Sequence, residues 1–286
     1  MSGSAIALVV CAAVLHATWN ALAKRAENQF AFLWSSVSLA TLLLLPLGLW
    51  RLPDEDSPMD GLPFVASSVA IHALYFWALG RSYRYGDFSR VYPMARGLGV
   101  ALVPLIALPV FGERLSWLGS LGIGLVVLGI AGLSRSPAAA RSAGGGIGAG
   151  TVWAIVTGLT IASYSLVDKA GVARLHPMPY IALMGLGLSV VLSPIVLADR
   201  RALVHEWQRR WRTIVVASAM NLTSYLLVLF AFRLSKVGYV VASRELSILF
   251  SAFIGSLWLG EGRLAPRLAG ASVVLAGVIC VALARD

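Results

Sequence analysis

Charged residues are scarce in this chain. Asp, Glu, Lys and Arg make up 13% of the 286 residues, against roughly 25% in soluble globular domains. Hydrophobic residues reach 58%, and the mean hydropathy is +0.81. This shortage of charge argues against a soluble fold and indicates that lipid surrounds most of the chain.

Cysteine is scarcer still, and the two present, Cys11 and Cys280, lie in apolar runs near opposite ends. The sequence has no Cys/His spacing typical of a metal site and no disulfide framework. It also has no P-loop or other nucleotide motif. We therefore expect no metal, no cofactor and no ATP-driven step.

Basic residues outnumber acidic ones, and the net charge is +10. They stand singly or in small groups between apolar runs, as membrane loops do, so we expect a lipid bilayer and no nucleic acid as partner. The densest group lies within 200–212 and directly follows an apolar segment. It predicts a cytoplasmic loop held at the negative surface of the leaflet.

Ten apolar segments approach the roughly 20 residues that a helix needs to cross a bilayer. Lipid cannot satisfy open backbone groups, and no barrel-like alternation is present, so these segments predict helices. The sequence thus predicts an all-α membrane protein with ten transmembrane helices, at 4–23, 30–50, 62–80, 88–111, 116–133, 150–168, 179–198, 212–232, 238–259 and 265–284.

A linker of small residues near the middle of the chain divides two similar halves. Arg96 matches Arg244, and Gly112-Glu113 matches Gly260-Glu261 at the same offset of 148; Lys24 matches Lys169. The predicted domains are a first five-helix repeat (3–134), the linker (135–149) and a second repeat (150–285).

An odd number of helices per repeat makes the second copy enter the membrane from the opposite face. The two copies are then inverted around a central cavity, an arrangement that alternating access uses directly.

At these residues the chain resembles the drug/metabolite transporter superfamily, in its ten-helix EamA-type branch. The resemblance covers about residues 3–285 and rests on Trp19-Asn20, Lys24, the segment Tyr92-Pro93-x-Ala95-Arg96-Gly97, the two Gly-Glu turns and the Gly-rich fifth and tenth helices. It implies a cavity lined by helices 1, 3, 4, 6, 8 and 9, with the others outside. Such relatives mostly move amino acids, other small metabolites or drugs, often outward.

Arg96 and Arg244 stand inside otherwise apolar helices, where a charge costs about 3 kcal/mol on insertion scales. A water-filled cavity, a carboxylate or an anionic substrate can offset that cost; alternatively, each arginine reaches the interface or bonds freed carbonyls. Pro93 and Gly97 predict an interrupted or kinked helix around Arg96.

Glu245 stands out as the acidic residue that the sequence places well inside a predicted helix, and we expect no second one. It is either a proton carrier in antiport or a neutralising partner for one of the arginines. Glu113 and Glu261, each beside a glycine at a predicted helix end, are interpreted as structural.

Polar and aromatic side chains on helices 1, 3, 4, 6, 8 and 9 suit a neutral or zwitterionic organic solute. Each of them alone is also compatible with packing between helices. The candidate substrate-binding residues are Trp19, Asn20, His72, Tyr75, Tyr92, Arg96, Tyr164, Asn221, Tyr225, Arg244 and Glu245.

We therefore predict a secondary transporter in the cytoplasmic (inner) membrane that exports amino acids or related small organic metabolites. An intramembrane enzyme is the first alternative, but no paired acids, metal cluster or serine dyad supports it, so we expect no catalysis. A non-transporting scaffold is the second. The glycines of the fifth helix suit close packing with a neighbour and leave a homodimer open.

The orientation of the chain can be tested with reporter fusions. Of 23 Lys and Arg residues, 14 lie in the loops that follow helices 1, 3, 5, 7 and 9, and 7 lie on the side of the termini. The positive-inside rule then puts both termini outside, whereas members of the family usually have them in the cytoplasm. We expect a C-terminal alkaline phosphatase fusion to be active; activity of a cytoplasmic reporter instead would favour the family orientation.

Overall fold

The computed structural model describes residues 1–54, 57–85, 88–133, 148–257 and 264–284. In these residues the chain is helical throughout, with short connections. The helices are α1 (Gly3–Lys24), α2 (Gln29–Arg51), α3 (Pro58–Tyr85), α4 (Phe88–Phe111), α5 (Trp117–Leu133), α7 (Ala149–Val172), α8 (Pro177–Leu197), α9 (Arg200–Leu234), α10 (Val237–Arg244), α11 (Leu246–Leu257) and α12 (Leu264–Leu283), with a 3-10 turn, η1, at Leu52–Asp54.

These helices confirm the ten predicted spans, because α10 and α11 together form the ninth. Seven of the helices in the described residues are long and apolar enough to cross a membrane alone, and α5 and α12 contribute shorter apolar stretches. Their outward surfaces carry large exposed side chains such as Leu43, Leu105 and Leu128. An aqueous surface would not favour such side chains in this number, whereas lipid does.

Three local predictions were wrong. Residues 200–209 are not a loop but a helix, which meets the spanning part of α9 at a kink where Arg210 has φ −131° and ψ 18°. α4 runs without interruption past Pro93 and Gly97, and the break occurs in the second copy instead, at Glu245. α7 continues beyond the predicted end at 168 to Val172.

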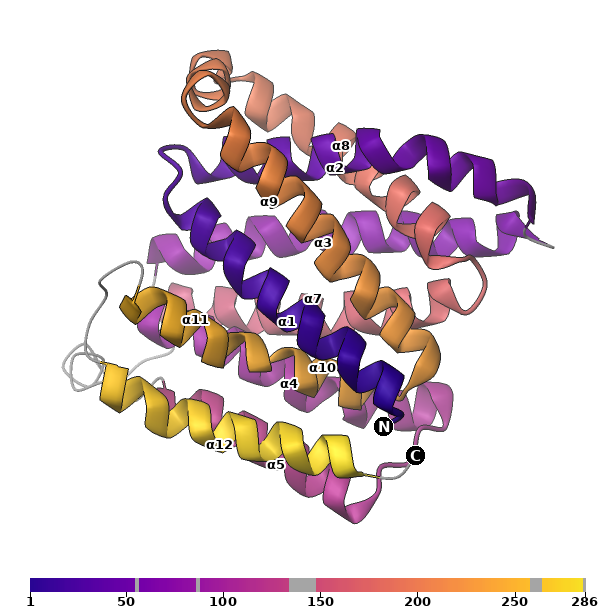
Figure 1. Ribbon diagram of the computed structural model, residues 1–286, viewed down its shortest axis with the longest axis vertical. Helices are drawn as coiled ribbons and strands as arrows, with labels where there is room; N and C mark the ends of the chain where they lie inside the picture. Colours follow the sequence, from indigo (N-terminus) through magenta and orange to yellow (C-terminus); the bar gives the residue numbers. More distant parts are fainter. Residues whose placement is uncertain (55–56, 86–87, 134–147, 258–263, 285–286) are drawn as a thin grey trace.

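The helices form two layers that exchange helices between the repeats. One layer contains α3, α4 and α5 of the first copy together with α7 and α8 of the second; the other contains α9 to α12 together with α1 and α2. Figure 1 shows α9, α1, α10–α11 and α12 in front of α3, α7, α4 and α5. The main contacts between neighbouring helices of a layer have counterparts when the copies are interchanged: α3 packs on α7 as α9 packs on α1, and α4 packs on α5 as α11 packs on α12.

Both ends of the chain lie at the same side of the bundle (Figure 1). The amino group of Met1 donates to the carbonyl oxygen of Ala284 at the end of α12, over 2.5 Å. An even number of spans requires this common side, so the bond agrees with the ten-helix count.

α5 and α12 approach each other through glycines. A Cβ added to Gly122 would lie 2.6 Å from the carbonyl oxygen of Gly277, and one added to Gly129 would lie 2.9 Å from that of Gly270. In both helices the two glycines are seven residues apart, so they occupy one face. At these glycines, the described atoms of the fifth helices of the two copies that meet are backbone atoms and valine side chains.

Gly122→Ala is expected to destabilise the protein by about 1–3 kcal/mol, because the new methyl group meets backbone atoms that cannot move aside. Gly124→Ala on the same helix is the matched control, since a Cβ added there would have no described atom within 4 Å. Thermal unfolding in detergent should show a lower midpoint for Gly122→Ala only. Equal midpoints would mean that α5 and α12 do not pack closely in solution.

Candidate functional site

A buried ion pair joins the two layers at the centre of the bundle. Nε of Arg96 on α4 donates to Glu245 over 3.2 Å, and a second guanidinium nitrogen donates to the other carboxylate oxygen over 2.5 Å. Arg96 is 8% exposed and Glu245 is 2% exposed. Removing one partner of such a pair costs about 3–5 kcal/mol, since it leaves a buried charge without compensation.

The break in the ninth span is what positions Glu245. Its N–H bonds the carbonyl of Ala242 as the cap of α10, and its own carbonyl accepts from Ile248 in the first turn of α11. Broken helices in membranes recur where they line solute sites, because the freed backbone groups must face protein or water. The predicted role of Glu245 as a neutralising partner of an arginine agrees with this geometry.

Arg244 ends α10 beside Glu245 but turns to a different neighbour. Its guanidinium lies 5.7 Å from the ring centroid of Tyr225 on α9. Within the described part of the chain it makes this cation–π contact and no ion pair. The site therefore contains one arginine held by a carboxylate and a second arginine held by an aromatic face.

A carboxylate that sequence reasoning missed is linked to Arg244 through Tyr225, which donates to it and whose ring faces the guanidinium. Asp168 on α7 is fully buried. Its Oδ1 accepts from Ser68 over 2.6 Å and from Tyr180 over 2.7 Å, and its Oδ2 accepts from Tyr225. The expectation that Glu245 is the one acid inside a helix is therefore wrong.

The sequence did not indicate Asp168 as a site residue because the predicted sixth helix ended at this position. A carboxylate at a helix end is usually assigned to the following loop. The residues that follow it up to Pro177 are compatible with a helix apart from Gly171, and this was the signal that α7 continues. Its three donors come from α3, α8 and α9, and no sequence spacing brings those helices together.

Four of the predicted residues with aromatic rings, one histidine and three tyrosines, gather beside Asp168. His72 is buried and stacks on Tyr164, with ring centroids 4.3 Å apart. Tyr75 meets Tyr164 edge to face at 5.8 Å, and the hydroxyl of Tyr225 lies 3.5 Å from Nε2 of His72. The structure thus unites these four rings with Asp168 in one cluster.

The remaining predicted residues do not join it in the contacts described. Asn20 is exposed and donates to the carbonyl of His16 over 2.7 Å. Trp19 packs beside Ala23 and Phe32 in a separate apolar cluster. Asn221 is half-buried and makes no hydrogen bond among the described residues, and the side chain of Tyr92 lies outside them.

Glu113 links the repeats at the membrane boundary. It follows Gly112, whose φ of 67° ends α4 in the left-handed conformation. Its Oε2 accepts from the N–H of Val237 at the start of α10 over 2.8 Å, and Lys169 lies 3.6 Å away. Burial raises the pKa of the Glu113 carboxyl, while Lys169 opposes that shift. This agrees with the structural interpretation of Glu113; Glu261 lies outside the described residues.

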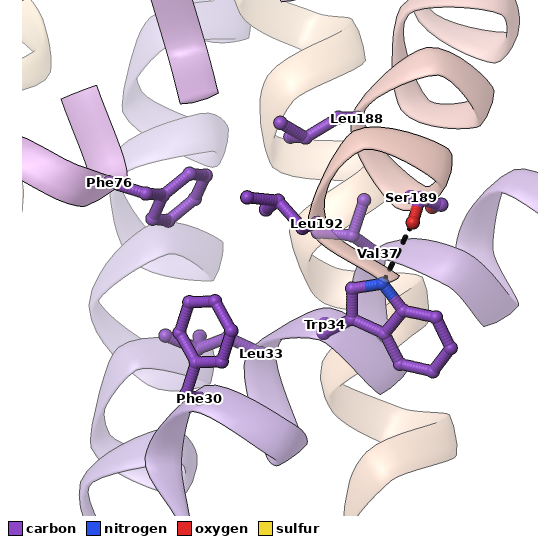
Figure 2. Close-up of a pocket in the computed structure, with 8 residues that line it drawn as sticks. All are labelled: Phe30, Leu33, Trp34, Val37, Phe76, Leu188, Ser189 and Leu192. Carbon is purple, nitrogen blue, oxygen red and sulfur yellow. Dashed lines mark hydrogen bonds between the residues drawn. The ribbon is translucent and has the colours of Figure 1, made fainter. Parts of the chain in front are cut away.

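A shallow apolar pocket lies away from these polar groups, between α2, α3 and α8 (Figure 2). The indole nitrogen of Trp34 donates to the carbonyl of Ser189 over 3.0 Å, and the hydroxyl of Ser38 donates to that of Ser189 over 3.0 Å. The other lining residues are apolar, and no charged residue lines the pocket in the described part of the chain. The ion pair and the Asp168 cluster, not this pocket, form the candidate site.

Comparisons with known proteins agree with the architecture. The sequence pattern of the EamA-like transporter family matches residues 3–135 and again 148–283. No curated protein sequence matches the chain. A solved structure, titled only as the crystal structure of a protein, has a TM-score of 0.71 with 16% identity, over 99% of this chain and 98% of its own. That likeness concerns the fold. Because the family pattern covers both repeats, this chain belongs to the EamA-like transporter family.

Proposed function

We propose that the protein is a secondary transporter of small zwitterionic metabolites, amino acids or related compounds, and that it exports them across the cytoplasmic membrane by alternating access. The observation that carries this proposal is the bidentate pair of Arg96 and Glu245 between the two layers. Membership of a transporter family makes transport the activity to explain.

The ion pair supports a solute with a carboxylate. A guanidinium binds carboxylates through two parallel hydrogen bonds and has five N–H donors, so Arg96 can bind a solute carboxylate while it stays paired with Glu245. Arg244, held only by the ring of Tyr225 among the described residues, offers a second cation close by. Together they provide more positive charge than Glu245 alone neutralises, which favours an anionic group on the solute.

The aromatic residues support a solute with an apolar or cationic part. Tyr75, Tyr164 and Tyr225 come from three helices; Tyr164 and Tyr225 contact His72, and Tyr75 contacts Tyr164. Their rings provide apolar contact area as well as faces that attract an ammonium group. A free amino acid combines these features with a carboxylate.

Alternating access is supported by where the contacts lie. Arg96, Glu245, Asp168, His72 and Tyr164 are buried, and Tyr75, Tyr225 and Arg244 are half-buried. We infer that a solute reaches the buried groups when the layers separate at one face. Inverted copies give two such openings of nearly equal energy. We also propose that the chain works as a multi-pass protein of the inner membrane; a homodimer through α5 remains a prediction.

Flux measurements in proteoliposomes separate transport from the competing classes. We expect purified protein to exchange a radiolabelled amino-acid mixture across the vesicle membrane faster than protein-free vesicles do. Chemical change of a labelled compound would favour an intramembrane enzyme. Absence of flux for amino acids, other small metabolites and drugs would favour a scaffold.

Arg96→Lys is expected to lower the apparent affinity for the transported amino acid at least tenfold. Lysine keeps the positive charge beside Glu245 but cannot form the two parallel bonds of a guanidinium. The matched control is Arg209→Lys, since Arg209 is exposed and pairs with Glu27 at 3.5 Å, a contact worth about 1 kcal/mol or less. An Arg96→Lys protein with the wild-type KM would contradict the assignment of Arg96 to the solute.

A further inference from the structure

The cluster around Asp168 contains a buried negative charge that the proposed solute site does not use. In the described residues all of its hydrogen-bond donors are hydroxyl groups, those of Ser68, Tyr180 and Tyr225, and it makes no ion pair there. Lys169, its neighbour in sequence, points elsewhere, to the carbonyls of Phe232 and Ser235 and to Glu113. An ionised carboxylate inside a membrane protein costs free energy when no cation pairs with it, and such residues most often have a function.

The hydrogen bonds fix which ring nitrogen of His72 carries its proton. Nδ1 lies 2.9 Å from the carbonyl oxygen of Ser68, which can only accept, so Nδ1 must donate. The hydroxyl of Ser68 already donates to Asp168. Nε2 is therefore unprotonated and faces the hydroxyl of Tyr225 at 3.5 Å.

Tyr225 consequently stands between an acceptor nitrogen and a carboxylate. It now donates to Oδ2 of Asp168. If a proton arrives at Nε2 of His72, it can pass to the tyrosine oxygen while the tyrosine's own proton passes to Oδ2. The result is a neutral histidine, a neutral Asp168 that donates to Tyr225, and a Tyr225 hydroxyl turned toward Nε2, so that every proton is accounted for.

We propose that Asp168, reached through His72 and Tyr225, is a proton-binding site that couples amino-acid export to proton entry. The inference rests on the proposed transport function. Oδ1 already accepts two hydrogen bonds and the group is fully buried, so a proton fits there without displacing a side chain. A solute ammonium does not.

Coupling follows from the charge that Asp168 loses. The ring of Tyr225 touches both the carboxylate, through its hydroxyl, and Arg244, through its face. An ionised Asp168 attracts the ammonium group of a zwitterion held by Arg96 and Arg244, whereas a protonated one does not. Proton and solute therefore bind in alternation, which is antiport.

Other charged or titratable groups from the surrounding helices also contribute to the field at this site. They are His72 of α3, Tyr164 and Lys169 of α7, Tyr180 of α8, Tyr225 of α9 and Arg244 of α10. The ion pair of Arg96 on α4 with Glu245, the residue after Arg244, also contributes. Since Glu245 is held in a bidentate pair with Arg96, Asp168 replaces it as the proton carrier.

The transport test uses proteoliposomes with and without a gradient of one pH unit and the radiolabelled amino-acid mixture. Wild-type protein is expected to accumulate label on the acidic side, up to about tenfold for one proton per solute, because one pH unit equals a tenfold ratio. In Asp168→Asn the ratio is expected to fall to about one. Accumulation on the alkaline side, or wild-type flux that ignores the gradient, overturns the proposal while leaving transport itself intact.

Two further variants keep the test decisive. Asp199→Asn is the matched control, because Asp199 caps the exposed start of α9 and asparagine caps equally well; it should keep the wild-type ratio. Tyr225→Phe keeps the ring beneath Arg244 and removes the relay hydroxyl, so it should lose the gradient response even if Asp168→Asn fails to fold. A wild-type response in Tyr225→Phe overturns the relay.

Infrared difference spectroscopy tests the proton site without any transport. Acidifying wild-type protein in detergent is expected to produce the carbonyl band of a buried, protonated carboxyl group, and Asp168→Asn is expected to lack that band while Asp199→Asn retains it. If wild-type protein shows no such band, Asp168 does not bind a proton. If the band appears but no solute is moved, the proposed transport function fails and the proton site stands.

Discussion

A charge buried in a lipid-facing bundle has to be compensated by the protein itself, and the central contacts of this structure follow from that constraint. Arg96 cannot reach water from the middle of α4, so it needs the carboxylate of Glu245. Glu245 can supply it only because the ninth span breaks there and leaves the residue at the junction of α10 and α11. The ion pair thereby fixes how closely the two layers approach.

Each layer contains helices of both copies, so the contact between the layers is built from both. α7 and α8 of the second copy pack with the first copy, while α1 and α2 pack with the second. Neither copy can therefore form its layer alone, and the site residues come from both. Both the bond from Arg96 to Glu245 and the bond from Tyr225 to Asp168 run between the layers, so any movement that separates the layers would break or reorganise them.

The symmetry of the backbone is not matched by the side chains. The α5–α12 contact is built from equivalent glycines on both sides, as expected where packing alone is needed. At the centre, in contrast, Glu245 and Asp168 both belong to the second copy, and the residues at the corresponding positions of the first, Gly97 and Ala23, are not acidic. The two copies thus share one architecture, while the two buried acids belong to one of them.

The sequence by itself determined the class of the protein, because hydropathy, helix length and repeat offset are local or periodic properties. It predicted ten spans, the pairing of Arg96 with Arg244 as equivalent positions, and several aromatic residues that do meet. It also proposed Asn20 and Trp19, which the structure places outside that cluster, because the face that a helix turns inward depends on its neighbours. Only the tertiary structure decided that Asp168 is buried, that Glu245 binds Arg96, and that helices exchange between layers. Each of these depends on contacts between residues more than 50 positions apart. The free energy of burial selects the partners in such contacts, and no local sequence pattern does.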